Sequence, residues 1–220
     1  MPYMNIEQAR FNMVEQQIRS WEVLDQRVLD LISDVPRENF VPMVYRNLAF
    51  ADISIPLGHD QVMMTPIVEG RLLQALMLTQ KDTVLEIGTG SGYLTALLAQ
   101  SAKHVDSVDI LEEFVKTAEQ RLNALNINNV SLETGDAIKG WNKFTCYDVI
   151  VLTGSVPVLE PHFQAQLNDG GCLFAIVGEE PVMQAQLISR VKEDEFNMEV
   201  LFETSLSPLI GADESEEFVL

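Results

Sequence analysis

The sequence predicts an α/β fold. We expect a doubly wound, mostly parallel sheet of seven strands with a helical N-terminal cap and a C-terminal antiparallel strand pair. From about residue 82, short segments rich in β-branched residues alternate with helical stretches, which is typical of a parallel sheet covered on both faces. The last two apolar segments are joined only by KEDEFN, which favours an antiparallel pair. A glycine-rich turn directly follows the first of these strands.

The N-terminal part, residues 5–50, is expected to be helical and rich in loops, because apolar residues recur there at helical spacing. One helix is expected to begin after Asp25 as N-cap and to end before Pro36. A later helix is expected to begin at Thr65-Pro66, with threonine as the cap and proline in the first position. Between them lies ADISIPLGHDQVMMTP, a loop punctuated by proline, glycine and histidine.

The seven expected strands are TVLEI, HVDSV, NVSL, YDVIVL, CLFAIV, AQLISRV and MEVLFET. These segments divide the chain into three parts. Residues 1–78 form the cap and a substrate loop, residues 79–211 form the core that binds the cofactor, and residues 212–220 form an acidic tail.

Composition limits the class of protein. The chain has 220 residues, 47% of them apolar, and a net charge of −19, which disfavours a nucleic-acid partner because phosphates must be neutralised. No apolar run is long enough to span a membrane, and the N-terminus lacks the apolar stretch of a signal peptide. Cys146 and Cys172 have no metal-ligand spacing, so we expect reduced core thiols, a cytoplasmic protein and no metal site.

The turn VLEIGTGSGYL indicates the kind of ligand. A strand, a glycine turn and a helix N-terminus form the usual geometry of a nucleotide site. Dinucleotide sites require G-x-G-x-x-G, whereas Gly88, Gly90 and Gly92 give G-x-G-x-G and Tyr93 occupies the sixth position. A P-loop is excluded as well, because no Lys-Ser/Thr pair follows the glycines.

Three carboxylates follow successive strands at the same edge of the expected sheet. Glu86 precedes the glycines and suits an ammonium group better than a pyrophosphate; Asp109 ends the next strand, where it can bind both ribose hydroxyls. Asp136 follows the third strand and can meet an adenine amino group. An ammonium, a ribose and an adenine without phosphate are the features of S-adenosylmethionine, which we expect as cofactor.

Each residue also has a simpler interpretation. Glu86 alone is compatible with a surface charge, and Asp109 alone with the N-cap of the helix in ILEEFVKTAEQ. Tyr93 is more typical of a packing residue beneath the loop than of a catalyst. The three carboxylates together favour the cofactor interpretation.

The segment E-I-G-T-G-S-G-Y, with V-D-S-V-D and G-D-A-x-x-G-W behind it, resembles class I S-adenosylmethionine-dependent methyltransferases, whose sheet is Rossmann-like. The motifs V-L-D-x-R-V-L-D-L-I-x-x-V-P-R-E-N-F-V-P and A-F-A-D-I-S-I-P-L-G-H-D-Q, then 148–153 and G-G-x-L, resemble protein-L-isoaspartate O-methyltransferases over about residues 10–211. The resemblance implies methyl transfer to the free α-carboxylate of an L-isoaspartyl residue. The residues expected at the cofactor are Glu86, Gly88, Thr89, Gly90, Gly92, Tyr93, Asp109, Ile110, Asp136, Ala137 and Thr153.

The sequence departs from the family pattern at GHDQVMMTP, where the family reads G-x-G-Q-T-I-S-x-P. Gln61 matches, but Val62 replaces the threonine and Met64 replaces the serine that carries the active-site hydroxyl. Thr65 is adjacent, with its side chain shifted by one residue. The catalytic positions implied by the resemblance are therefore Gln61, Met64 and Thr65. The T-A-A that follows the family's fourth strand is also altered, to 153–155 Thr-Gly-Ser.

Three functions remain open at this point. The first is a methyltransferase of the isoaspartate-repair type with reduced or redirected activity, whose partner is a protein or peptide. The second is a methyltransferase acting on another carboxylate or a small molecule. The third is a non-catalytic protein that binds the cofactor. A carboxylate is already ionised at neutral pH and needs no general base, so Met64 does not forbid methylation.

Overall fold

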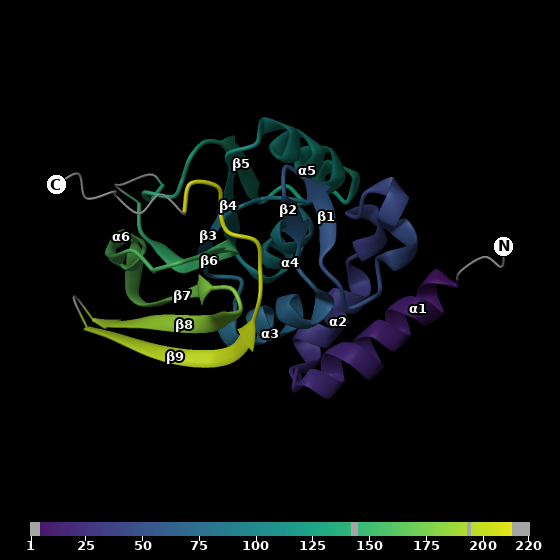
Figure 1. Cartoon of the computed structure of the whole chain (residues 1–220), viewed down its shortest axis with the longest axis horizontal. Helices are drawn as coiled ribbons and strands as arrows, with labels where there is room; N and C mark the ends of the chain where they lie inside the picture. The colour runs from purple at the N-terminus through teal and green to yellow at the C-terminus, as the bar shows by residue number, and fades with distance from the viewer. Residues whose placement is uncertain (1–4, 142–144, 193–194, 213–220) are drawn as a thin grey trace.

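A computed structural model describes residues 5–141, 145–192 and 195–212. Its centre is a seven-stranded sheet in the order β5-β4-β3-β6-β7-β8-β9 (Figure 1). The strands are β3 (Thr83–Ile87), β4 (His104–Asp109), β5 (Val130–Thr134), β6 (Tyr147–Val156), β7 (Leu167–Glu179), β8 (Val182–Lys192) and β9 (Glu195–Thr204). The first five of these are parallel, and β8 and β9 pair antiparallel, which confirms the predicted sheet.

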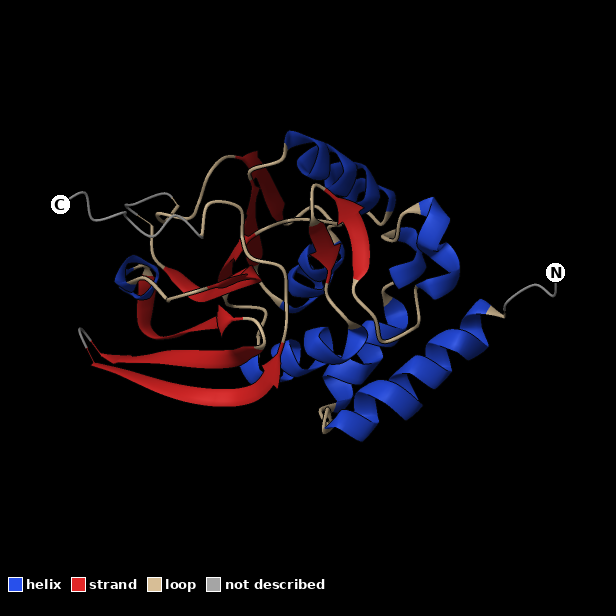
Figure 2. Ribbon diagram, in the orientation of Figure 1, coloured by secondary structure: helices blue, strands red, loops and turns tan. Residues whose placement is uncertain are grey.

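The helices of the N-terminal part gather on one side of the molecule (Figure 2). They are α1 (Ile6–Asn12), η1 (Met13–Ile18), η2 (Arg19–Trp21), α2 (Gln26–Asp34), η3 (Arg37–Asn39), η4 (Met43–Leu48) and α3 (Pro66–Leu76). Asp25 accepts a hydrogen bond from the Arg27 N–H and caps α2, and Thr65 caps α3 with Pro66 in its first turn. Both predicted helix starts are confirmed.

The remaining helices connect the strands of the sheet. They are α4 (Tyr93–Ser101), α5 (Glu112–Ala124) and α6 (Pro161–Ala165). The central strands are buried on both faces: Val84 belongs to the hydrophobic cluster shared with the cap, and the adjacent Leu85 belongs to the cluster on the opposite face. Burial on both faces explains the near-continuous apolar runs VIVL in β6 and LFAIV in β7.

A second, two-stranded sheet lies in the segment expected to be a loop. Strands β1 (Ile55–Gly58) and β2 (Gln61–Met63) pair antiparallel and form a hairpin. The turn residues His59 and Asp60 adopt φ angles of 52° and 58°, which matches the twist of a tight hairpin although neither is glycine or asparagine. The expectation of a loop is therefore wrong here, because the usual turn signal is absent.

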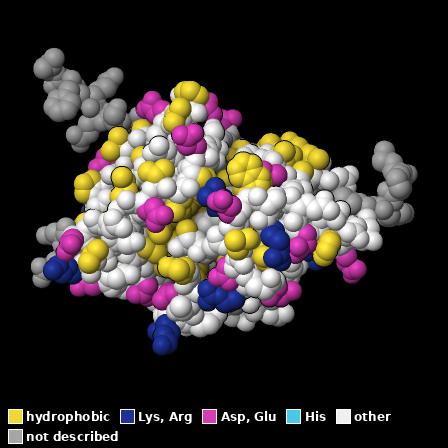
Figure 3. Space-filling model, turned by 90° about the horizontal axis from the view of Figure 1, so that it is seen from below, with side chains coloured by type: hydrophobic (Ala, Val, Ile, Leu, Met, Phe, Trp, Pro, Cys, Tyr) yellow, Lys and Arg dark blue, Asp and Glu magenta, His cyan; other side chains and the backbone are white. Residues whose placement is uncertain are grey.

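Two further expectations concern cysteines and charge. Both cysteines are free, but Cys146 is exposed because it lies just before β6 begins, so the prediction that both are core thiols is wrong for it. Asp and Glu side chains are scattered over the face seen in Figure 3, with fewer Lys and Arg among them. In the described part of the chain, no helix has the length and apolar character needed to cross a membrane. Nearly all of the acidic tail predicted for 212–220 lies outside the described residues.

Candidate cofactor cleft and acceptor wall

The glycine loop has the sharp curvature that its sequence predicts. Gly88, Gly90 and Gly92 have φ angles of 99°, 50° and 80°, in the left-handed region that favours glycine. A Cβ atom on Gly88 would lie 2.1 Å from Oγ1 of Thr153, and one on Gly92 would lie 2.8 Å from Cβ of Ala118. The loop therefore approaches both β6 and α5 more closely than any other residue type permits.

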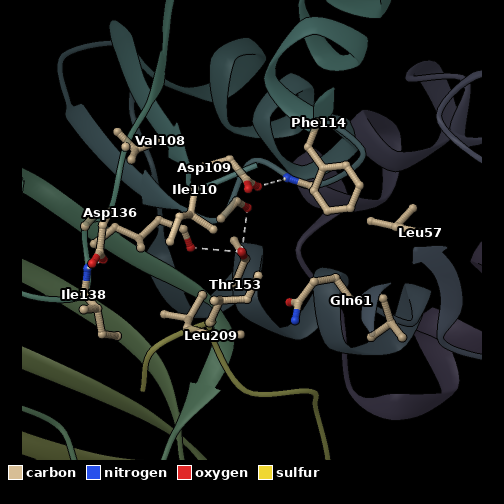
Figure 4. Close-up of a pocket in the computed structure, with 18 residues that line it drawn as sticks. Leu57, Gln61, Val108, Asp109, Ile110, Phe114, Asp136, Ile138, Thr153 and Leu209 are labelled. Atoms are coloured by element: carbon tan, nitrogen blue, oxygen red, sulfur yellow. Dashed lines mark hydrogen bonds between the residues drawn. The ribbon is translucent and has the colours of Figure 1, made fainter. Parts of the chain in front are cut away.

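A cleft of about 580 Å³, partly open to solvent, lies beside this loop at the carboxyl edge of the parallel strands (Figure 4). This is the place where open α/β sheets bind ligands. Its walls come from the loop, from the ends of β4, β5 and β6, from the β1–β2 hairpin and from a C-terminal segment. Predicted site residues that line it are Gln61, Gly88, Gly90, Asp109, Ile110, Asp136, Ala137 and Thr153.

Asp109 connects the end of β4 to the glycine loop. Its Oδ2 accepts a hydrogen bond from the Gly90 N–H at 2.8 Å, and its Oδ1 accepts one from the Leu111 N–H at 2.9 Å. Burial raises the pKa of this carboxyl above its usual value, and the hydrogen bonds from the main chain oppose the shift. The N-cap of α5 is Leu111, so Asp109 is not the cap that the simpler interpretation required.

Glu86 is fully buried, so the interpretation as a surface charge is wrong. Its Oε2 accepts hydrogen bonds from Thr95 at 2.5 Å and from Ser107 at 2.6 Å. Its Oε1 has no hydrogen-bond partner among the described residues, and the residue lines a small cavity beneath the hairpin. Burial raises the pKa of this carboxyl to about 8. A buried acceptor without a donor fits a ligand that carries an N–H donor, such as an ammonium group.

One part of the cleft wall is formed by Asp136 and two apolar neighbours. Asp136 is exposed, and its Oδ1 accepts a hydrogen bond from the Ile138 N–H at 3.0 Å (Figure 4). Ala137 is buried next to it, and Ile110 lies across the cleft with 40% of its surface exposed. A flat apolar ligand fits between such side chains.

Two threonines hold the loop in place. Thr153, at the end of β6, donates to the carbonyl oxygen of Gly88 at 2.6 Å. Thr89 points below the loop, where its hydroxyl lies 2.7 Å from the hydroxyl of Ser107. Thr153 therefore lies in the cleft wall, whereas Thr89 lines only the small cavity beside Glu86.

Tyr93, Gly92 and Thr65 line neither the cleft nor the small cavity. The Tyr93 ring is 1% exposed and packs 5.5 Å from the ring of Phe40, beneath the loop. The packing interpretation therefore describes its side chain. The side chain of Thr65 is engaged as the cap of α3. This bond uses the hydroxyl only as an acceptor, so what separates Thr65 from an acceptor is its position outside both cavity linings.

The hairpin supplies an apolar wall where the resemblance implies hydroxyls. Val62, Met63 and Met64 line the small cavity with Glu86. Both methionines are buried, with 4% and 5% of their surface exposed. The amide of Gln61 donates to the Pro208 carbonyl oxygen at 3.4 Å, so it joins the hairpin to the C-terminal segment. Neither residue 62 nor residue 64 supplies a hydroxyl to this cavity.

Some residues of the cleft were not predicted from the sequence. Phe114 of α5 lines it from one side, and Leu209 and Ile210 line it from another. The segment that carries Leu209 is held by Ser155, whose N–H donates to the Ser207 carbonyl oxygen at 3.0 Å and whose carbonyl accepts from the Leu209 N–H at 2.9 Å. A Cβ on Gly154 would lie 2.9 Å from Cδ2 of Leu209, so the altered 153–155 run is what leaves room for this wall.

Comparison with known proteins gives one family. A family model described as protein-L-isoaspartate(D-aspartate) O-methyltransferase matches residues 8–214. The chain is 36% identical over 196 residues to a protein-L-isoaspartate O-methyltransferase of Klebsiella pneumoniae, covering 88% of this chain and 92% of that one. It is 37% identical over 210 residues to protein-L-isoaspartate O-methyltransferase 2 of Pelobacter propionicus, covering 95% and 93%.

Solved structures agree in fold. A Plasmodium falciparum protein described as a protein-L-isoaspartate O-methyltransferase, solved with S-adenosyl-L-homocysteine, superposes with a TM-score of 0.78 at 17% identity, over 94% of this chain and 99% of that one. Another structure named protein-L-isoaspartate O-methyltransferase gives a TM-score of 0.75 at 23% identity, over 90% and 65% of the two chains.

Proposed function

Because the chain belongs to the protein-L-isoaspartate(D-aspartate) O-methyltransferase family, we propose that it transfers a methyl group from S-adenosylmethionine to the free carboxylate of an L-isoaspartyl residue. One carboxylate oxygen forms a bond to the methyl carbon, the carbon–sulfur bond breaks, and its electron pair stays on sulfur. The products are a methyl ester and S-adenosylhomocysteine. No proton needs to be removed, since the acceptor carboxylate is already ionised at neutral pH.

The cofactor supplies a methyl group activated by its positive sulfonium. The residues that would hold it are those around the glycine loop: Glu86 for the ammonium, Asp109 for the ribose hydroxyls and Asp136 for the adenine. The feature that fits this ligand is Glu86, whose buried Oε1 has no hydrogen-bond partner among the described residues and lines a cavity.

The chain's remaining contribution is to align the acceptor and exclude water. Val62, Met63 and Met64 present apolar surface beside the glycine loop, which removes water from an entering carboxylate and makes it more reactive. Without a hydroxyl at residue 64, one oriented hydrogen bond to the acceptor is missing. Such a donor contributes about 3 kcal/mol when it acts in the transition state, so a reduced rate on isoaspartyl peptides is expected.

The proposal rests on the family assignment and on the buried Glu86 carboxylate oxygen that has no hydrogen-bond partner among the described residues. An experiment in two parts tests it. Calorimetry with S-adenosylhomocysteine and with NAD should detect binding of the first only. A methyl-ester assay with an isoaspartyl peptide and the matched aspartyl peptide should detect ester on the isoaspartyl peptide alone. Binding of NAD alone would contradict the cofactor assignment, and cofactor binding without ester formation would contradict the substrate assignment.

A second candidate is methyl transfer to a different acceptor, either another carboxylate or a small molecule. The observation that favours it is the apolar wall itself, since Val62 and Met64 offer no hydrogen bond to an anionic acceptor. A screen of carboxylate-containing and uncharged acceptors for S-adenosylhomocysteine release distinguishes the two candidates.

We also propose that the enzyme works in the cytoplasm on protein or peptide substrates. Two free cysteines support a reducing compartment. Fractionation of cells that express the protein tests the location.

A further inference from the structure

The arginine of the cap, Arg37, is fully buried and is the largest side chain among the fully buried ones described. It is the first residue of η3, between α2 and η4. A buried guanidinium is unfavourable unless its charge is paired and its donors are used. The contacts that satisfy Arg37 therefore show what it is placed to hold.

Its donors reach both ends of one segment. Nε donates to the carbonyl oxygen of Ala49 at 2.9 Å, and Nη2 donates to the carbonyl oxygen of Met64 at 2.6 Å. Residues 49–64, here called the hairpin segment, carry β1 and β2 between these two points. One guanidinium thus closes the hairpin segment at its base, which lysine cannot do because it lacks a planar fork of donors.

Two further contacts fix the arginine itself. Nη1 forms a buried ion pair with Glu69 of α3. The guanidinium carbon also lies 4.8 Å from the centre of the Tyr93 ring, on the first residue after the glycine loop. Arg37 therefore connects the base of the hairpin segment to the helix that carries the glycine loop.

The tip of the hairpin segment, at the β1–β2 turn, is held more weakly than its base. At its tip, His59 lies 2.6 Å from a carboxylate oxygen of Glu113, with the two side chains 49% and 62% exposed. Exposed ion pairs of this kind contribute little. The long Gln61–Pro208 hydrogen bond is also exposed. We call Val62, Met63 and Met64 the acceptor wall. Its position relative to the cofactor cleft is therefore set mainly by the contacts of Arg37 at the base of the hairpin segment.

We propose that Arg37 is a positioning residue for methyl transfer: by binding both ends of the hairpin segment and stacking beneath the glycine loop, it fixes the distance between the acceptor wall and the cofactor cleft. The effect on kcat that this inference predicts rests on the proposed function, because it is measured with an isoaspartyl peptide. Arg37 itself lines neither the cleft nor the small cavity, but it binds two residues that line the small cavity, Met64 through its carbonyl oxygen and Glu69 through its carboxylate, so it acts through them.

The test compares Arg37→Met and Arg37→Lys with a matched control, Arg71→Met. Arg71 likewise donates to a main-chain carbonyl, that of Leu201 at 3.2 Å, and stacks 4.2 Å from the ring of Phe202, but on the β9 side, away from the cleft. Three quantities are measured: amide hydrogen exchange of the hairpin relative to β3 and β4, affinity for S-adenosylhomocysteine, and kcat and KM with an isoaspartyl peptide.

For Arg37→Met we expect amide hydrogen exchange in residues 55–63 to be at least tenfold faster and kcat to be at least tenfold lower than in wild type. The affinity for S-adenosylhomocysteine should stay within about threefold of wild type, because the residues proposed to bind the cofactor lie at the ends of other strands. Arg37→Lys should give hydrogen-exchange and kcat values between those of Arg37→Met and wild type. Arg71→Met should match wild type within about twofold in hydrogen exchange, cofactor affinity and kinetic constants. If Arg37→Met fails to fold, Arg37→Lys decides the question.

Unchanged hairpin exchange in a folded Arg37 variant would overturn the proposal, and so would equal losses of kcat and cofactor affinity, or the same pattern in Arg71→Met. If wild type binds the cofactor but forms no isoaspartyl ester, the proposed substrate fails, while the exchange measurement still decides the role of Arg37.

Discussion

Replacing Glu86 by glutamine should change stability and cofactor binding in opposite directions. Glutamine keeps the shape and can still accept from Thr95 and Ser107. Burial raises the pKa of Glu86 to about 8, from 4.5 for an unburied glutamate. Between these values the folded protein holds a proton that the unfolded chain has released, so the free energy of unfolding of wild type falls as pH rises from about 4.5 to 8.

The size of this effect follows from the difference in pKa. At about 1.4 kcal/mol for each pKa unit, the wild-type protein should lose roughly 5 kcal/mol of this contribution across the window. Glu86→Gln has no such titration. Chemical denaturation of both proteins without cofactor, at several pH values from 4.5 to 8.5, should show the glutamine variant gaining stability relative to wild type with pH.

Cofactor affinity should move the other way. A carboxylate facing the ammonium stabilises the complex, so Glu86→Gln should weaken S-adenosylhomocysteine binding at pH 8 by more than about tenfold. Wild-type affinity should also increase with pH up to about 8, because the carboxyl must lose its proton to pair with the ammonium, whereas the variant should show no such slope. A stability difference that does not depend on pH, or unweakened binding by the variant at pH 8, would refute this account of Glu86.

Three further changes have defined outcomes. Asp109→Ala should weaken S-adenosylhomocysteine binding more than Asp136→Ala in calorimetry, since Asp109 also holds the Gly90 N–H; equal affinities in both variants would contradict the placement. The double variant Val62→Thr with Met64→Ser should raise isoaspartyl ester formation at least tenfold with little change in cofactor affinity, and an inactive variant that still binds cofactor would argue against the substrate. Tyr93→Phe should stay within about 1 kcal/mol of wild-type stability and keep its cofactor affinity, because the ring keeps its packing against Phe40 and the residue lines neither the cleft nor the small cavity; a large loss of binding would show that the hydroxyl is needed.

Local patterns in the sequence predict the sheet and several of the residues that line the cleft. Alternating strands and helices predict parallel pairing, and parallel strands end at one edge, so the sequence predicts Glu86, Asp109 and Asp136 at the same edge of the sheet. The glycine spacing likewise predicts a loop with positive φ angles. Both features depend on neighbours in sequence and on general rules of topology.

For the altered hairpin, the sequence shows which residues have changed, and the structure shows where their side chains lie. The motif GHDQVMMTP shows that hydroxyls are missing at 62 and 64, but not that Val62 lies in a strand, that Met64 directly follows it, or that both line a cavity with Glu86. A His-Asp turn carries no clear hairpin signal, so the pairing of β1 with β2 is determined by packing against the loop and by the contacts at both ends of the segment.

Only the tertiary structure decided which side chains of the motifs face the cleft. Tyr93 follows the glycines in sequence yet packs beneath them on Phe40 and Arg37, and Leu209 reaches the cleft from a segment that has no motif of its own. The sequence by itself determined the family, the sheet and the kind of ligand. Contacts between residues far apart in the chain determined the environment of Glu86, the wall at Leu209 and the position of Arg37. Their geometry comes from packing and burial of the whole fold, which local spacing does not encode.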